Sequence, residues 1–335
     1  MPPRPAERGE SGVIGRTFRE SAMHKILVLG GAHIDRRGRI DGETAHGASN
    51  PGHWFVEAGG GGFNAARNLA RLGLTVRMIS PRGGDVDGES VAAAALAAGV
   101  DDRPFTFLDR KTPSYTAILE RDGNLVIALA DMELYRLFSP RRLAVRAVRD
   151  AMAEADLVLC DANLPQDTIA ALSARARHLG KRVAAIAISP AKVPRYRDSL
   201  DDIDFLFMNE AEAQALVGQR PETAEGWPAL LSQAGLSGGV VTRGREAAIG
   251  FAGDRSVSLL PPTIDTIADV TGAGDSLAAG VLYGVMRGLA FEEAMRFGAA
   301  AAAITVQSPL ATAENLSADA LRDMLALVPA AKILS

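Results

Sequence analysis

Short apolar segments alternate with longer amphipathic segments along most of the chain. The apolar segments each predict a buried strand and comprise 25–31, 75–80, 156–161, 182–189, 204–209 and 238–244. The segments between them have helical spacing and comprise 63–73, 88–98, 140–154, 166–179 and 210–217. Continuous apolar strands separated by helices are typical of a parallel sheet that is covered on both faces. The pattern therefore predicts an α/β fold.

Two segments interrupt this alternation: about 39–58 is polar and turn-rich, and about 103–130 has the pattern of strands joined by a turn. In the second segment, Asp122-Gly123 separates two alternating runs, which favours a β-hairpin. Both segments therefore predict β-structure outside the main sheet. We expect them to form a small sheet at its rim, where such a sheet would act as a lid over a site.

The first 22 residues differ from the rest of the chain. They are rich in Pro, Arg, Gly and Glu and lack an apolar central stretch, so a secretory signal does not fit. We expect residues 1–22 to be a disordered arm that precedes a single domain over 23–335.

Composition narrows the class of protein. The 335 residues include 47% hydrophobic residues, enough for a sizeable core, and the net charge is -4. A strongly basic nucleic-acid binder and a polybasic membrane-surface protein are therefore poor fits. No apolar run approaches the roughly 20 residues that a membrane-spanning helix needs. The single cysteine, Cys160, cannot form a disulfide within one chain and is best explained as a core thiol. We expect a cytoplasmic protein without nucleic-acid or membrane partners.

The most informative segment is DVTGAGDSLAAG at 269–280, where a glycine-rich turn leads into an amphipathic helix. Gly272 and Gly274 allow backbone shapes that other residues resist. The amides of Ala273, Gly274 and Asp275 would point out of the helix start, which favours anion binding. Asp275 has two interpretations: it caps the helix, or it accepts a proton beside a bound phosphoryl group.

This segment resembles the D-T-x-G-A-G-D signature of the ribokinase-like (PfkB) carbohydrate kinase family, and the resemblance extends from residue 25 to about 328. It implies a three-layer α/β sandwich with a mostly parallel central sheet and a small β-sheet lid. It also implies ATP-dependent phosphorylation of a primary hydroxyl of a sugar or nucleoside. Asp275 would be the general base, and the backbone of Gly272, Ala273, Gly274 and Asp275 would form the anion hole.

A second glycine cluster opens the segment EAGGGGFNAARNLARLG at 57–73. The spacing Gly60-x-Gly62-x-x-Ala65 formally matches a dinucleotide fingerprint, so a dehydrogenase is an alternative, although the fingerprint should follow the first buried strand directly. The cluster resembles the family's G-G-x-G-x-N signature more closely. That resemblance implies that Gly60 and Asn64 contact substrate hydroxyls; otherwise Asn64 is a helix-start cap.

Two further residues lie in GGAHID, which we expect at the end of the first strand. The resemblance places Asp35 where the family binds sugar hydroxyls, and a carboxylate can accept hydrogen bonds from two vicinal hydroxyls. His33 stands where relatives often have Asn. It either bonds a hydroxyl or is a packed histidine.

Two more segments resemble the part of the family's site that binds the nucleotide, and we call their residues the nucleotide-side residues. Asn209 and Glu212 match its N-x-x-E motif, which implies that they organise Mg²⁺ through water; Mg²⁺ keeps several waters in proteins. Thr242, Arg243 and Gly244 match the strand and turn near the phosphates of ATP. A P-loop motif is absent from the sequence.

Asp269 falls where some relatives bind a monovalent cation, so the resemblance points to K⁺ as a second ion. Family members also pair two chains through the lid, which makes a homodimer a further expectation.

Several short sequence segments resemble the pseudouridine kinase branch. These segments are 48–52, 59–73, 112–132, 161–165 and Ser189-x-x-Lys192. The chain departs from that branch at Phe63, Ala130 and Ile186. Pseudouridine is therefore the first hypothesis for the substrate. Ribokinase or another sugar or nucleoside kinase is the alternative, and a non-catalytic sugar or nucleoside sensor is the alternative of another class.

Overall fold

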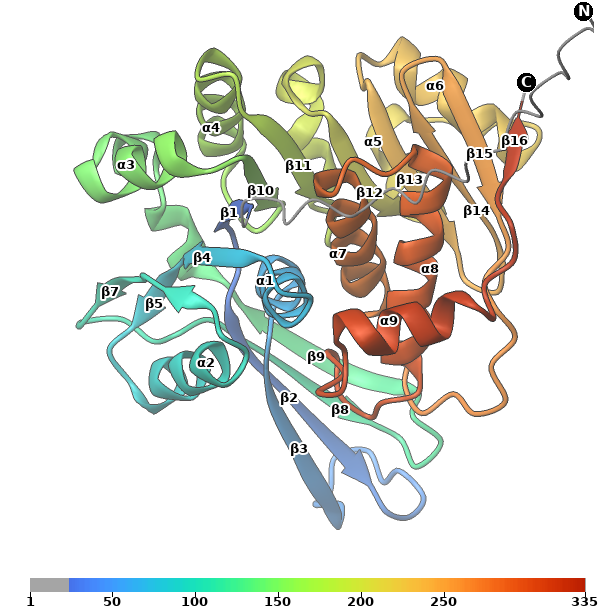
Figure 1. Cartoon of the computed structure of the whole chain (residues 1–335). Helices are drawn as coiled ribbons and strands as arrows, with labels where there is room; N and C mark the ends of the chain where they lie inside the picture. Colours follow the sequence, from blue (N-terminus) through green and yellow to red (C-terminus); the bar gives the residue numbers. More distant parts are fainter. Residues whose placement is uncertain (1–23, 335) are drawn as a thin grey trace, which may run out of the picture.

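The computed structural model describes residues 24–334, so the arm predicted at 1–22 lies outside the described residues. A ten-stranded sheet forms the centre of the molecule (Figure 1). Its order is β16 (Lys332–Leu334), β15 (Arg255–Leu259), β14 (Glu246–Ala252), β13 (Gly238–Arg243), β12 (Phe205–Asn209), β11 (Arg182–Ile186), β10 (Leu157–Asp161), β1 (Lys25–Leu29), β4 (Thr75–Ile79) and β6 (Asp101–Asp102).

The strands from β6 to β13 are parallel, and β14, β15 and β16 continue the sheet in antiparallel pairs. Every apolar segment that predicted a buried strand is a strand of this sheet. Because parallel strands have their carboxyl ends at the same edge, the loops that follow β1, β10, β11 and β12 come together there.

Helices cover both faces of the sheet. One layer contains α1 (Gly61–Arg71), α2 (Val86–Ala97), α7 (Ala273–Met286), α8 (Phe291–Val306) and α9 (Ala318–Leu325). The other contains α3 (Arg146–Glu154), α4 (Gln166–His178), α5 (Glu210–Val217) and α6 (Trp227–Gln233).

Strand β1 shows why both layers are needed. Ile26 and Val28 belong to one hydrophobic cluster, whereas Leu27 and Leu29 belong to the other. Successive side chains point to opposite faces, so a strand that is apolar throughout has to be covered twice. Cys160 of β10 is fully buried, as predicted. The three-layer sandwich is therefore confirmed.

The helix predicted over 140–154 is divided in two. A 3₁₀ turn, η2 (Pro140–Ala144), precedes α3, and Val145 between them has an extended backbone. Other 3₁₀ segments are η1 (Glu133–Leu137), η3 (Val193–Asp202) and η4 (Ala224–Gly226). None of the helices in residues 24–334 combines the length and the apolar character needed to cross a membrane.

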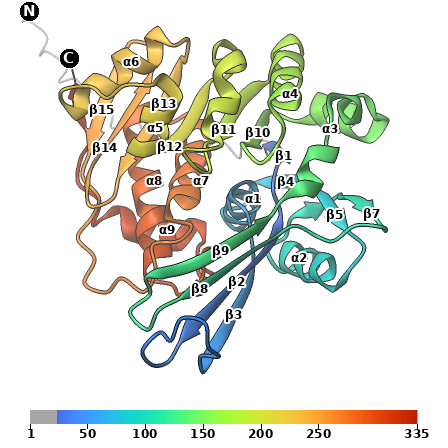
Figure 2. The ribbon, with the colours of Figure 1, turned by 180° about the vertical axis from the view of Figure 1, so that it is seen from behind.

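A separate four-stranded sheet extends away from the layered body (Figures 1 and 2). Its order is β3 (Gly52–Gly59), β2 (His33–Ile40), β8 (Ser114–Leu119) and β9 (Leu125–Asp131). The β8–β9 hairpin turns at Asp122-Gly123, where Gly123 has a φ of 94°. A short parallel pair, β5 (Pro81–Gly83) and β7 (Phe105–Phe107), continues the chain directly after β4 and β6.

One placement from the sequence is wrong. His33 and Asp35 were expected at the end of the first strand, but they begin β2, a strand of the small sheet. Strand β1 ends at Leu29, and the chain then leaves the central sheet. The two glycines that follow leave room for side chains from the end of β10: a Cβ on Gly30 would lie 2.7 Å from Cγ of Asp161, and a Cβ on Gly31 would collide with Nδ2 of Asn163.

Candidate active site

The glycine-rich turn at 269–272 leads directly into α7. Gly272 lies just before the helix with a φ of 76°, in the left-handed region. A Cβ at this position would collide with the carbonyl oxygen of Ala311. Only glycine satisfies both constraints, so the turn can approach the rest of the chain closely and expose the start of the helix.

The first amides of α7 differ in their partners. The amide of Ala273 donates to the carbonyl of Val270 at 3.3 Å. Within residues 24–334, the amides of Gly274 and Asp275 have no backbone acceptor. Unsatisfied amides at a helix start, together with the helix dipole, favour an anion. The arrangement can therefore bind a phosphoryl group mainly through the amides of Gly274 and Asp275.

Asp275 is half-buried at this helix start. The pKa of its carboxyl is raised to about 7, chiefly by burial and also by the nearby carboxylates of Asp161 and Glu212. A hydrogen bond from Asn64 and the charge of Arg67 act in the opposite direction. A carboxylate with a pKa near neutrality is suited to accept and release a proton at physiological pH.

Asn64 holds one oxygen of that carboxylate. Its Nδ2 donates to Oδ2 of Asp275 at 2.8 Å, and its Oδ1 accepts from Nη2 of Arg67 at 2.7 Å. Arg67 is buried and also donates to the carbonyl of Ala58 at 2.7 Å. A guanidinium has no acceptor atom, so Arg67 can bind only the amide oxygen of Asn64. The amide nitrogen of Asn64 therefore points toward Asp275. Arg67 was not predicted from the sequence.

The start of α1 approaches the small sheet at Gly60 and His33. Gly60 has a φ of 110°, and a Cβ there would lie 3.1 Å from Nδ1 of His33. The Nε2 atom of His33 is 3.2 Å from Oδ1 of Asp35. Its Nδ1 is 2.9 Å from the hydroxyl of Tyr135, which is fully buried. Both ring nitrogens therefore have protein partners, and His33 connects Tyr135 to Asp35.

The buried carboxylate of Asp161, at the end of β10, accepts hydrogen bonds from three segments of the chain. Its Oδ2 accepts from the amides of Gly31 and Gly62, each at 2.9 Å. Its Oδ1 accepts from the amide of Asn163 at 2.9 Å, and Nζ of Lys192 donates to Oδ1 of Asn163 at 2.6 Å. These bonds fix the loop after β1 against the start of α1.

A cavity of about 270 Å³ opens beside Asp275. It is lined by catalytic and nucleotide-side residues that were predicted from the sequence, and by four apolar residues that were not assigned to the site. Its lining is Ile186, Ile188, Phe207, Met208, Asn209, Glu212, Thr242, Gly272, Gly274 and Asp275. The cavity therefore joins the start of α7 to the carboxyl ends of β11, β12 and β13.

Asn209 and Glu212 form a reciprocal cap at the start of α5. Oδ1 of Asn209 accepts from the amide of Glu212 at 2.9 Å, and Oε2 of Glu212 accepts from the amide of Asn209 at 2.7 Å. Such a capping box stabilises the helix start. Burial raises the pKa of Glu212 above its ordinary value.

This region suits Mg²⁺ only in a partly hydrated form. Among the described residues, no group of three or more His, Cys, Asp and Glu side chains could hold a metal ion. Mg²⁺ commonly uses one or two carboxylates together with water and substrate phosphates. Glu212 at the cavity wall, beside the anion-binding helix start, fits that mode.

The three remaining nucleotide-side residues lie at the β13–β14 turn. The hydroxyl of Thr242 is 3.4 Å from the carbonyl of Met208, and Gly244 turns with a φ of 64°. Nε of Arg243 donates to Oε1 of Glu210 at 3.1 Å, and its Nη2 pairs with Glu246. Thr242 lines the cavity, whereas Arg243 and Gly244 do not.

Asp269 faces the small sheet. Its Oδ2 accepts from Nη1 of Arg37 at 2.7 Å, and its Oδ1 accepts from the amide and the hydroxyl of Thr271 at 2.9 and 2.8 Å. Arg37 also donates to Glu57 at 2.6 Å. Asp269 therefore connects the turn before α7 to β2 and β3.

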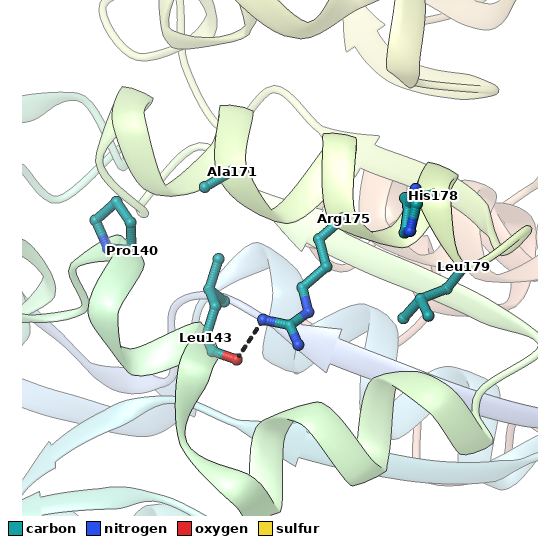
Figure 3. Close-up of a pocket in the computed structure, with 6 residues that line it drawn as sticks. All are labelled: Pro140, Leu143, Ala171, Arg175, His178 and Leu179. Atoms are coloured by element: carbon teal, nitrogen blue, oxygen red, sulfur yellow. Dashed lines mark hydrogen bonds between the residues drawn. The ribbon is translucent and has the colours of Figure 1, made fainter.

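A larger cavity of about 400 Å³ lies elsewhere, between η2 and α4 (Figure 3). Arg175 lies across it and donates to the carbonyl of Leu143 at 3.2 Å. The neighbouring side chains, such as Pro140, Ala171 and Leu179, are apolar. This cavity holds none of the residues predicted for the site, so the smaller cavity at Asp275 is the better candidate.

The dinucleotide-binding alternative does not fit the fold. The glycines at 59–62 follow β3, an antiparallel strand of the small sheet, and not the first strand of a βαβ unit. A dinucleotide fingerprint requires that unit, because the pyrophosphate binds between the strand end and the helix start. The fold and the site together define an α/β protein with an anion-binding helix start beside a half-buried carboxylate.

Comparison with known proteins gives the family. The model of the pfkB family carbohydrate kinases matches residues 23–318, and the chain belongs to this family. Its relatives carry kinase names, so it is an ATP-dependent sugar or nucleoside kinase.

Two relatives from Escherichia coli strain K12 are similar over nearly the whole chain. An uncharacterized sugar kinase, YeiI, is 32% identical over 94% of this chain and 86% of its own length. A pseudouridine kinase is 27% identical over 92% of this chain and 98% of its own length.

Solved structures agree on the fold. A carbohydrate kinase from Agrobacterium tumefaciens superposes with a TM-score of 0.85 at 64% identity, over 93% of this chain and 100% of its own. The ribokinase of Arabidopsis thaliana, solved with ribose and ATP, has a TM-score of 0.80 at 23% identity, over 91% of this chain and 99% of its own. The ribokinase-like fold is therefore confirmed.

Proposed function

We propose that this kinase phosphorylates the 5′-hydroxyl of a nucleoside, with pseudouridine as the first candidate, and that Asp275 is its general base. The observation that carries the proposal is the position of Asp275. Its carboxyl lines a cavity at a helix start where two amides have no backbone acceptor in the described part of the chain, and burial raises its pKa to about 7.

The two oxygens of Asp275 have different roles in this mechanism. Oδ2 is occupied by Asn64 at 2.8 Å, so Oδ1 receives the proton of the attacking hydroxyl. The hydroxyl oxygen forms a bond to the γ-phosphorus, and the bond from that phosphorus to the leaving diphosphate oxygen breaks. The amides of Gly274 and Asp275 donate to the transferring group, whose negative charge they stabilise.

The sugar is proposed to lie between the start of α1 and the small sheet. Asp35 and Gly60 would contact its hydroxyls, and His33 would orient Asp35 through their 3.2 Å contact. Asn64, predicted as a hydroxyl ligand, would act mainly through Asp275. The small sheet is proposed as the lid, since closure over the sugar would keep water from competing as the nucleophile.

The nucleotide is proposed to bind along the other wall of the cavity. Thr242 and Gly244 would lie near its phosphates, and Glu212 with Asn209 would hold the waters of Mg²⁺. Bound Mg²⁺ would neutralise phosphate charge during transfer. Arg243 would have to leave Glu210 or Glu246 to reach a phosphate. A dependence on ATP is consistent with a cytoplasmic location.

A K⁺ ion at Asp269 is a separate proposal. It would share that carboxylate with Arg37 and Thr271. Activity measured with K⁺ and with Na⁺ at equal ionic strength tests it. Equal rates in the two salts would remove K⁺ from the mechanism.

The nature of the acceptor is tested by ATP turnover with pseudouridine, uridine, adenosine, ribose and fructose. We expect the highest kcat/KM with pseudouridine, in line with the similarity to a pseudouridine kinase. A preference for ribose would favour the ribokinase alternative instead. Tight binding of an acceptor without turnover would favour a sensor and contradict the proposal.

The outward face of the small sheet supports a homodimer. The register places Trp54, Gly38, Ile118 and Ile127 in one row across the sheet. Trp54 and Ile127 are 59% and 66% exposed, and Leu129 is 71% exposed. Alternation along β2 turns Asp35 to the opposite face. A contiguous apolar face of this kind is unusual on a monomer, and we propose that it pairs two copies of the chain.

A further inference from the structure

Ile188 adopts a backbone shape that isoleucine normally avoids. Its φ is 69°, and it is the one non-glycine residue with positive φ in residues 24–334. The amide of Ser189 donates to the carbonyl of Ala187 at 2.9 Å, which closes a three-residue turn around Ile188. A γ-turn with positive φ is rare and strained, above all for a β-branched residue. Such strain persists only where the surrounding structure requires it.

The strained turn places Ile188 beside the proposed base. Ile188 follows β11 at the carboxyl edge of the central sheet and lines the same cavity as Asp275. A Cβ on Gly61 would collide with Cδ1 of Ile188 and would lie 3.2 Å from Oδ1 of Asp275. The isoleucine side chain and the reactive oxygen therefore both lie next to the backbone of Gly61.

The contacts of Ile188 show why its direction matters. Its side chain packs against both hydrophobic clusters, one on each face of the sheet. It thus closes the gap between the two layers at the cavity. Ile186, two residues earlier, is buried and lines the cavity as well. Together they make the wall beside Asp275 apolar.

We infer that Ile188 is a positioning residue whose strained turn holds an apolar wall against Oδ1 of Asp275 and keeps water away from it. This inference rests on the proposed role of Asp275 as base. With the wall in place, the acceptor hydroxyl is the nucleophile. Without it, a water oxygen could bond to the γ-phosphorus, releasing ADP and phosphate, while its proton passes to Asp275.

The other groups around Asp275 do not replace this wall. Asp161 of β10, Glu212 of α5 and Arg67 of α1 act on it through charge, and Asn64 donates a hydrogen bond. Ile188 carries no charge. Its removal therefore changes the hydration of the carboxyl and leaves these charges in place.

Two substitutions distinguish the effect of the Ile188 side chain from the effect of its strained backbone. Ile188→Gly and Ile188→Ala both remove the side chain, but only glycine adopts the positive φ without cost. We expect both variants to raise ATP hydrolysis without acceptor several-fold relative to phosphoryl transfer. We also expect both to move the acidic limb of the kcat/KM pH profile down by about one pH unit, because hydration favours the ionised carboxyl. The melting temperature of Ile188→Gly should exceed that of Ile188→Ala.

The control is Ile169→Ala, which removes the same side chain from a buried position on α4. It should lower the melting temperature and leave the hydrolysis-to-transfer ratio unchanged. An unchanged ratio and pH limb in Ile188→Gly would overturn the inference, even if Ile188→Ala fails to fold. A change of the same size in Ile169→Ala would also overturn it.

The inference and the proposed function fail in different ways. If the wild-type chain phosphorylates none of the acceptors, the proposed function fails. The Asp275 carboxyl can then be titrated by ¹³C NMR, with Asp275→Asn to assign its signal. A titration midpoint that is the same in the wild type and in Ile188→Gly would refute the shielding by Ile188 independently of activity.

Discussion

Nδ2 of Asn64 donates a 2.8 Å hydrogen bond to Oδ2 of Asp275 across 211 positions of sequence. The bond joins the start of α1 to the start of α7, so it couples the two glycine clusters of the chain. It also leaves Oδ1 as the oxygen that can accept a proton. This relationship gives the proposed mechanism its first tests.

Replacing Asp275 by Asn removes the proposed proton acceptor and keeps the shape of the side chain. We expect kcat to fall about 10²–10⁴-fold, the range typical of a positioned acid–base group. Binding of acceptor and nucleotide, measured by calorimetry, should persist. Turnover close to that of the wild type would contradict the role of Asp275.

The same substitution should affect stability in a pH-dependent way. The folded-state pKa of Asp275 is raised from 3.8 to about 7, so folding favours the protonated form. Its contribution to stability is fully present below about pH 4 and is lost as the pH rises through about 7. Asp275→Asn should therefore raise the melting temperature relative to wild type more at pH 8 than at pH 5. An equal gain at both values would show that the carboxyl is not perturbed.

Replacing Asn64 by Ala should raise the pKa of Asp275 further, because the lost hydrogen bond favours the ionised form. A hydrogen bond to a charged group contributes about 1.5–3 kcal/mol, which corresponds to a rise of about 1–2 pH units in the acidic limb of kcat/KM. Asn68→Ala is the matched control, since Asn68 lies one turn beyond Asn64 on α1 and its Nδ2 donates to Oγ of Ser276, the residue after Asp275, at 2.8 Å. The control should lower stability and leave the pH limb in place.

Replacing Tyr135 by Phe tests the contact between Tyr135, His33 and Asp35. Loss of one buried hydrogen bond costs about 1–3 kcal/mol, and a poorly oriented Asp35 would bind the acceptor less well. We expect KM for the acceptor to rise about 5-fold or more, with KM for ATP unchanged. Tyr283→Phe on α7, also buried, should change neither constant. A rise in both KM values of Tyr135→Phe would indicate general disruption instead.

Replacing Ile127 by Asp places a charge in the apolar face of the small sheet. If that face pairs two chains, burying an unpaired carboxylate is costly, and sedimentation velocity should show monomers where the wild type forms dimers. Leu96→Asp introduces the same charge at an 81% exposed position on α2 and should leave the dimer intact. A wild type that is monomeric at high concentration would remove the proposal.

Local patterns predicted the main elements of the fold. The apolar runs identified strands β1, β4, β10, β11, β12 and β13, because a strand buried on both faces is apolar throughout. Strands β6, β14, β15 and β16 of the central sheet were missed. β15 alternates apolar and polar residues and β16 has three residues, so neither carries a continuous run. The break at Val145 was missed because helical spacing continues on both sides of it.

The sequence by itself determined the chemistry at the start of α7. A glycine turn, free amides and a carboxylate are neighbours along the chain, so their juxtaposition depends on helix geometry alone. The family resemblance at Asp275, Asn209 and Glu212 had the same local basis. These residues lie at one cavity.

Only the tertiary structure decided which groups act on that carboxylate. Arg67 orients Asn64, Asp161 fixes the loop after β1, and Tyr135 holds His33, all through contacts between distant segments. The strained turn at Ile188 is equally invisible in the sequence, because isoleucine disfavours positive φ. Packing of α1, α7 and β11 at one edge of the sheet imposes these contacts, and periodicity along the chain carries no information about them.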